Sequence, residues 1–139
     1  MIVLDSNVTS ALMQPHQNGS VRTWLDRQPQ ATLWTTSVSV LEIRGGLLLL
    51  PEGRRRGALM AAFDRMLVEL FVGRILPFDH EAAENSARIQ ADRIRRGINK
   101  ETRDTQIAGI VMSRRATLAT RNVRDFQDLD IPLVDPWIA

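Results

Sequence analysis

The stretch IVLDSN at residues 2–7 sets an apolar run of strand length against three residues that favour turns and helix starts, Asp5, Ser6 and Asn7. It predicts a first strand over residues 1–4 that runs directly into a helix. Acidic or amide side chains also stand against apolar runs in three further stretches: SVSVLEI at Glu42, RDTQIAGI at Asp104, and TLATRNVRDF at Asn122 and Asp125.

Strand-like and helix-like segments alternate along the chain. β-Branched and apolar runs predict strands at 31–36, 74–78, 117–120 and 131–134. Helical spacing predicts a helix near residues 21–28, one over 38–50 capped by Ser37, one over 58–71, one from Asp79 to Gly97, and one over 102–114. Strands separated by helices imply parallel pairing. We therefore expect an α/β fold, a three-layer α/β/α sandwich with a central, mainly parallel sheet.

Composition limits the classes of function. The 139 residues suit one domain over 1–139, and the absence of cysteine excludes disulfides and thiolate metal sites. The two histidines, His16 and His80, are far apart in sequence, so zinc chemistry is not expected. The sequence carries no signal-peptide pattern, and its apolar run at 47–50 is cut off by Pro51. We expect a cytoplasmic protein that does not enter a membrane.

The predicted fold brings the acidic residues to one edge of the sheet. In open α/β sheets, ligands bind beyond the carboxyl ends of the strands. Asp5 and Asn122 follow two predicted strands, whereas Glu42 and Asp104 lie in helices that begin at the same edge. Several carboxylates gathered there would repel one another unless a cation or arginines compensated. Mg²⁺ or Mn²⁺ suits such oxygen ligands and would favour phosphoryl chemistry.

Each of these residues also has a purely structural explanation. Asp5 could cap a helix, and Asp104 could favour the positive end of a helix dipole. Glu42 could pair with Arg44 or Arg121. Asn122 and Asp125 could form turns, and the arginine clusters at 54–56, 93–96, 114–115 and 121–124 suit either a nucleic-acid backbone or a solvated face.

At these residues the chain resembles the PIN-domain ribonucleases of the VapC toxin family, most closely the FitB-like branch, over nearly its full length. The family's aspartate after the first strand matches Asp5 in DSN. Its helical glutamate matches Glu42 in LEIRGG, and its third acid matches Asp104 in DTQIAG. The final TRN-x-x-DF element supplies Thr120, Asn122, Asp125 and Phe126, and the segments LPEGRRR, GRILPFD and ATLATRNVRDF are also similar.

The resemblance implies an Mg²⁺- or Mn²⁺-dependent endoribonuclease, the toxin of a type II toxin–antitoxin module. It also implies a homodimer and a VapB/FitA-like antitoxin whose tail occupies the acidic pocket, with DNA bound only through that antitoxin. Asp5 and Asp104 would be the principal metal ligands, and Glu42 would bind the metal or orient a water. Asp125 would supply a fourth acid through indirect contacts. The residues expected to hold this network are Ser6, Asn7, Thr120 and Asn122.

Four positions depart from the family pattern. Arg103 directly precedes Asp104, where its charge would lower the pKa of Asp104 or compete with a cation. Gly109 stands where small alanines are frequent, and Arg115 where a helix-ending glycine is common. Asn122 replaces an aspartate found in some members, which removes one charge.

Other classes of function remain as alternatives. A binding module with this fold could pair with an antitoxin and have little or no activity. A phosphatase of the haloacid-dehalogenase type would need an aspartate where Asn7 stands, and a phosphoacceptor would need a lysine near the last site, whereas Lys100 is the only lysine. A Rossmann nucleotide site is not supported, since no glycine-rich turn follows the first strand.

Overall fold

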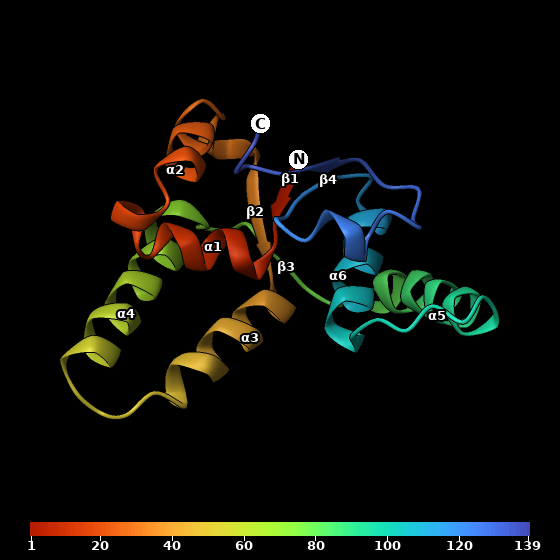
Figure 1. The fold of residues 1–139 in the computed structure, drawn as a ribbon, viewed down its shortest axis with the longest axis horizontal. Coiled ribbons are helices and arrows are strands. Elements are labelled where there is room, and N and C mark those ends of the chain that lie inside the picture. Colours follow the sequence, from red (N-terminus) through yellow and green to blue (C-terminus); the bar gives the residue numbers. More distant parts are fainter.

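A parallel sheet lies at the centre of the molecule (Figure 1). The computed structural model describes residues 1–139, apart from the side chain of Pro15. The strands follow the order β3-β2-β1-β4-β5, and every neighbouring pair is parallel. Their bounds are β1 (Ile2–Leu4), β2 (Leu33–Thr36), β3 (Ile75–Leu76), β4 (Thr117–Ala119) and β5 (Leu133–Val134).

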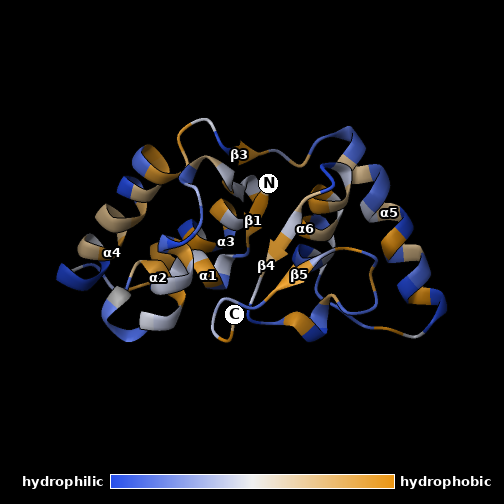
Figure 2. Cartoon of the chain, turned by 90° about the horizontal axis from the view of Figure 1, so that it is seen from above, coloured by the Kyte–Doolittle hydropathy of each residue, from blue (hydrophilic) through white to orange (hydrophobic). Residues whose placement is uncertain are grey.

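Helices cover both faces of this sheet, as Figures 1 and 2 show, with α1, α2 and α4 on one side and α5 and α6 on the other. Their bounds are α1 (Ser6–Leu12), α2 (Gly19–Asp26), α3 (Ser37–Leu48), α4 (Arg54–Arg65), α5 (His80–Arg95) and α6 (Thr102–Ser113). The predicted three-layer α/β/α sandwich with a parallel sheet is confirmed. Across the described residues, no helix combines the length and apolar character required to cross a bilayer.

Successive residues of a strand point to opposite faces, and both faces of this sheet are buried. On β1, Val3 packs in the cluster beneath α5 and α6, while Leu4 packs in the cluster beneath α1 and α2. On β4, Leu118 and Ala119 divide in the same way, and all four side chains are fully buried. Burying an aliphatic side chain contributes about 1.5–3 kcal/mol, so this double cover stabilises the central strands.

The order of the strands reverses between β1 and β4. From β1 the chain moves outward through β2 and β3 and then returns, through α5 and α6, to pair β4 with the other edge of β1. The ladder continues one residue past the strand, because the Asp5 N–H donates to the Ala119 carbonyl at 2.9 Å. The segments that follow β1 and β4 therefore lie side by side, at the position where such sheets bind ligands.

The cap of α3 differs from the predicted one. Thr36, the last residue of β2, is the N-cap, and its Oγ1 accepts a hydrogen bond from the Ser39 N–H at 3.0 Å. Ser37 is the first helical residue, and its hydroxyl oxygen accepts instead from the Phe78 N–H at 3.3 Å. Both residues carry a hydroxyl, and the extended backbone of Thr36 within the sheet decides which one caps.

Other boundaries also differ from the prediction, most clearly at β2 and α4. Residues Gln30–Thr32 form a 3-10 turn, so β2 begins at Leu33. The helix expected from Ala58 begins at Arg54, because the preceding arginines are good helix formers, and its continuation over Met66–Leu70 is a π-helical turn.

The predicted ends of α5 are confirmed. The Asp79 side chain accepts a hydrogen bond from the Ala82 N–H at 2.9 Å and so caps the helix. Gly97 follows the helix with a φ of 70°, a left-handed conformation that glycine adopts without a steric penalty.

Helices α5 and α6 approach closely at Gly109. A Cβ atom on this residue would lie 1.9 Å from the Ser86 Oγ and 2.5 Å from the Ala82 carbonyl oxygen. The Ser86 hydroxyl is itself engaged, since it donates to the Thr105 carbonyl at 3.0 Å. Gly109 is therefore required by helix packing, which explains this departure from the family pattern.

We predict that Gly109→Ala destabilises the fold, although alanine is the better helix former by about 1 kcal/mol. Its methyl group must displace backbone of α5, and overpacking of this kind costs about 1–3 kcal/mol. Thermal unfolding followed by circular dichroism should show a lower Tm. The control is Gly57→Ala on α4, where an added Cβ meets nothing within 4 Å and the Tm should stay equal or rise. An unchanged or higher Tm for Gly109→Ala would show that the two helices can separate freely.

Candidate active site

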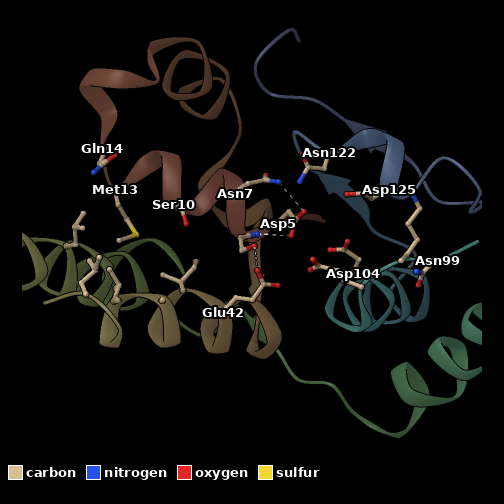
Figure 3. A pocket seen from close by; sticks show the side chains of 18 residues that line it. Asp5, Asn7, Ser10, Met13, Gln14, Glu42, Asn99, Asp104, Asn122 and Asp125 are labelled. Carbon is tan, nitrogen blue, oxygen red and sulfur yellow. Dashed lines mark hydrogen bonds and ion pairs between the residues drawn. The ribbon is translucent and has the colours of Figure 1, made fainter.

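A cavity of about 680 Å³ opens beyond the carboxyl ends of β1 and β4. Figure 3 shows Asp5 near its centre, with Glu42, Asp104 and Asp125 around it on three other segments. Asp5 follows β1, Glu42 lies on α3, Asp104 lies in the first turn of α6, and Asp125 ends the 3-10 turn Val123–Asp125. The four acids chosen from the sequence thus line one cavity, together with Glu101.

Asp5 is the most deeply placed of these acids, with 4% of its surface exposed. Its Oδ1 accepts from the Ser6 N–H at 2.8 Å, and its Oδ2 accepts from the Thr120 hydroxyl at 2.8 Å. Within the described part of the chain, no basic side chain forms an ion pair with it. Burial raises the pKa of Asp5, the two hydrogen bonds lower it, and the charge of Glu42 raises it further. The protein therefore buries an acidic group without a cationic partner.

Thr120 joins the two neighbouring segments beyond the sheet. Its Oγ1 donates to Asp5 and accepts from the Asn7 side-chain amide at 3.3 Å and from the Asn122 N–H at 3.1 Å. The Asn7 Oδ1 in turn accepts from the Arg121 N–H at 3.3 Å. The network that the sequence suggested at Asn7, Thr120 and Asn122 is present as a set of hydrogen bonds.

Glu42 makes neither of the ion pairs that would explain it structurally. Its Oε2 accepts a hydrogen bond from the Ser6 hydroxyl at 2.9 Å. Arg44 is bound to Asp64 at 2.6 Å and also stacks on the Phe63 ring. Arg121 stacks on the ring of Trp137, 4.8 Å from its centre. Both proposed partners of Glu42 are thus occupied elsewhere, and Glu42 faces the cavity.

The pKa of Asp104 is raised well above its usual value. Burial, followed by the charges of Asp5 and Asp125, raises its pKa from 3.8 to about 6. We expected Arg103 to lower this pKa or compete with a cation, and the effect on the pKa is the opposite. Arg103 is exposed, so solvent screens its charge, whereas the neighbouring acids share the cavity with Asp104.

Two basic side chains contact Asp125, and neither was assigned to the site from the sequence. Its Oδ1 lies 3.3 Å from the Lys100 Nζ, and its backbone carbonyl accepts from the Arg93 guanidinium at 2.8 Å. Lys100, Asn99 and Glu101 form part of the connection between α5 and α6 and line the cavity. No local pattern distinguished them, because their place depends on how that connection folds.

Arg93 is the main site-supporting residue that sequence reasoning missed. It lies in a basic cluster that suggested an RNA-binding or solvated surface, yet only 2% of it is exposed. Its guanidinium makes two hydrogen bonds to the Asp128 carboxylate, at 2.9 and 3.0 Å, and one to the Thr105 hydroxyl at 3.1 Å. It therefore joins α5 to the start of α6, beside Asp104, and to the segment that carries Asp125.

The acids line one cavity, but their side chains do not surround a common point. Among the residues that the structure describes, no three acidic, histidine or cysteine side chains stand close enough to form a ready-made metal site. The predicted gathering of acids at one sheet edge is thus found, whereas a preformed set of three ligands is not.

Comparison with known proteins identifies the fold family. The chain matches the PIN domain family over residues 2–132. It belongs to that family. This PIN domain is 33% identical over 137 residues to Toxin FitB of Neisseria gonorrhoeae, with 99% of each chain covered. It is 31% identical over 137 residues to VapC ribonuclease Y4jK of Sinorhizobium fredii, covering 99% of this chain and 98% of that one.

A solved structure agrees with these relatives. The structure of FitAB bound to the IR36 DNA fragment has a TM-score of 0.89 and 33% sequence identity to this PIN domain, covering 99% of this chain and 96% of that chain. The resemblance to VapC-type PIN domains of the FitB-like branch, inferred from the motifs at Asp5, Glu42, Asp104 and Asp125, is confirmed.

We predict that Asp128→Asn destabilises the protein at neutral pH by about 3–5 kcal/mol, because it leaves the buried Arg93 charge without its partner. Arg93 lowers the pKa of Asp128, so this stabilisation is present above pH 3.8 and is lost as the pH falls further. Urea unfolding measures the change. The control is Asp92→Asn, which removes an exposed pair with Arg96 and should cost no more than about 1 kcal/mol. Equal effects of the two variants would contradict a structural role for Arg93.

We also predict that Asp104→Asn raises the Tm of the metal-free protein at neutral pH. The folded state raises the pKa of Asp104 to about 6, so between pH 3.8 and about 6 it binds this proton more tightly than the unfolded state does. The free energy of unfolding of the wild type therefore loses this contribution as pH rises through that range. The Tm advantage of Asp104→Asn should grow up to about pH 6 and then level off, as scanning calorimetry in EDTA can measure. A lower Tm at pH 7 would contradict the repulsion between the acids.

Proposed function

We propose that this PIN domain is an Mg²⁺- or Mn²⁺-dependent endoribonuclease that acts as the toxin of a type II toxin–antitoxin module. The observation that carries the proposal is Asp5, buried without a cationic partner in a cavity lined by four further acids. Burying several like charges together destabilises a fold, and such arrangements cluster at functional sites. The relatives named as a toxin and a ribonuclease support this reading.

The donor atoms in the cavity fit a hard divalent cation. The candidate ligands are carboxylate oxygens, which Mg²⁺ and Mn²⁺ prefer, and neither histidine nor cysteine lines the cavity. The open arrangement of the acids is compatible with Mg²⁺, which usually binds one or two carboxylates and keeps several waters. Asp5 and Asp104 would hold the ion directly, and Glu42 would hold it or orient a water.

The side chains of the cavity would orient the metal ligands and accept a proton. A bound ion would lower the pKa of water and offset charge on the phosphate. Thr120 and the Ser6 N–H fix both oxygens of Asp5, so its carboxylate is oriented before substrate arrives. Ser6 holds Glu42 through Oε2, which leaves Oε1 to accept a proton from the attacking water. The water oxygen then bonds to phosphorus, one P–O ester bond breaks, and the leaving oxygen takes up a proton from solvent. Asp125 supplies further negative charge at the side of the cavity that Lys100 approaches.

The antitoxin would bind in the apolar part of the same cavity. Away from the acids, the wall is formed by apolar residues on the α1 side, on α3 and α4, and in the connection between α3 and α4: Met13, Ile43, Leu47, Leu50 and Leu59. An amphipathic segment fits such a groove and would block access to the acids. DNA would be bound only by the antitoxin of the complex, and the homodimer stays a prediction.

The function is tested with purified protein and a labelled single-stranded RNA. Cleavage should require Mg²⁺ or Mn²⁺ and stop in EDTA. Asp5→Asn keeps a side chain able to cap α1 and should reduce the rate by about 100-fold or more, as should Asp104→Ala. The control is Asp26→Asn, an exposed residue paired with Arg22 outside the cavity, which should cleave like the wild type.

Full cleavage in EDTA would refute the proposal. A wild-type protein that binds an antitoxin but neither binds Mn²⁺ by isothermal titration calorimetry nor cleaves RNA would instead be the noncatalytic binding module. Equal activity of Asp5→Asn and Asp26→Asn would trace any observed cleavage to a contaminating nuclease.

A further inference from the structure

Lys100 is the only basic residue among those that line the acidic cavity. The chain has 18 lysines and arginines, and Lys100 is its single lysine. Five acids line the same space: Asp5, Glu42, Glu101, Asp104 and Asp125. One positive charge thus faces five negative ones in the place where an RNA phosphodiester, itself an anion, would have to enter.

The contacts of Lys100 leave most of its hydrogen-bonding capacity unused. Its ammonium carries three donors, and the structure gives it one partner, the Asp125 Oδ1 at 3.3 Å. The side chain of Lys100 is 26% exposed, so its amine is held near the cavity and is still reachable. A single contact at this distance fixes the position of the amine without saturating it.

The arginines that form ion pairs are not available to contact a phosphate in the cavity. Arg93 is buried and fully engaged by Asp128, Thr105 and a backbone carbonyl. The pairs formed by Arg22, Arg44, Arg96 and Arg114 lie outside the cavity. An ammonium also suits the site because it is a compact point charge with freely rotating donors, a common phosphate ligand.

We propose that Lys100 is a catalytic residue that donates a hydrogen bond to a non-bridging oxygen of the scissile phosphodiester, while Asp125 holds its amine in place. The inference rests on the proposed ribonuclease function. Negative charge on the phosphate oxygens increases as water attacks, so a fixed ammonium stabilises the transition state more than the bound substrate. The ammonium also offsets the repulsion between RNA and the acids.

The competing explanation is that Lys100 only positions Asp125 and never contacts RNA. The two roles have different consequences for metal binding. A lysine that positions an acidic ligand group supports metal affinity, so its removal weakens Mn²⁺ binding. A lysine that contacts phosphate opposes the ion through like charge, so its removal leaves Mn²⁺ binding equal or tighter.

The first experiment compares wild type, Lys100→Met, Lys100→Arg and Arg96→Met in cleavage of a labelled single-stranded RNA. A hydrogen bond to a charged group predicts that Lys100→Met lowers kcat/KM by about 10–100-fold. Lys100→Arg should recover part of this loss because it keeps the charge. Arg96→Met is the matched control, since it removes one positive charge and one ion pair outside the cavity, and its kcat/KM should stay within about 2-fold.

The second measurement is Mn²⁺ binding by titration calorimetry without RNA. Lys100→Met should bind Mn²⁺ at least as tightly as the wild type. A loss of Mn²⁺ affinity in Lys100→Met that Asp125→Asn reproduces would overturn the proposal and make Lys100 a positioning residue.

The third measurement uses the fact that the chain has one lysine. Mild acetylation can modify only the ε-amine of Lys100 and the terminal amine of Met1, which serves as the internal reference. In the presence of RNA bound by the Asp104→Asn protein, as followed by fluorescence anisotropy, acetylation of Lys100 should slow several-fold relative to Met1. Bound RNA that leaves Lys100 as reactive as before would overturn the contact.

The outcomes separate the two proposals. If the wild type cleaves RNA and Lys100→Met matches it within about 2-fold, the role of Lys100 fails while the ribonuclease function stands. If the wild type neither binds nor cleaves RNA with Mn²⁺, the ribonuclease function fails and the role of Lys100 fails with it.

Discussion

The hydrogen bond from the Thr120 hydroxyl to Asp5 holds the cavity together, and it joins residues 115 positions apart. It forms because β4 pairs with β1 in a register that sets Leu4 opposite Ala119. A slip of one residue would turn the side chains of β4 to the opposite face and move Thr120 away from Asp5. The apolar residues that alternate between the two buried faces therefore fix the geometry of the polar site as well as the stability of the sheet.

Much of the fold was predictable because its signals are local. The strand at residues 2–4, the cap at Asp79 and the glycine end at Gly97 each depend on neighbouring residues. The gathering of Asp5 and Glu42 was also predictable, since in a parallel α/β sheet the segments that follow the strands share one edge. Asp104 reaches the same edge because α6 leads back into β4 and so begins there. The prediction was wrong at the start of α3, where the hydroxyls of Thr36 and Ser37 could each cap the helix. The pairing of β2 with β3 decides that Thr36 is the cap.

The electrostatics of the site were less predictable, because charge acts through space and burial. Arg103 is adjacent to Asp104 in sequence but exposed, and the acids that raise the pKa of Asp104 are distant in sequence. Arg93 lies among exposed arginines, yet it points into the interior and binds Asp128. No pattern of sequence neighbours distinguishes a buried arginine from a solvated one within such a run.

Asp5 is made early in translation, whereas Thr120, which orients it, is made late. While a ribosome is still making the chain, β1, α1 and α3 can already be present, but β4 and the residues after it are not. Asp5 then lacks the hydroxyl that orients it, and the cavity lacks the side that carries Asp125. A growing chain thus cannot assemble this cavity until the residues up to Asp125 have been made and β4 has paired with β1.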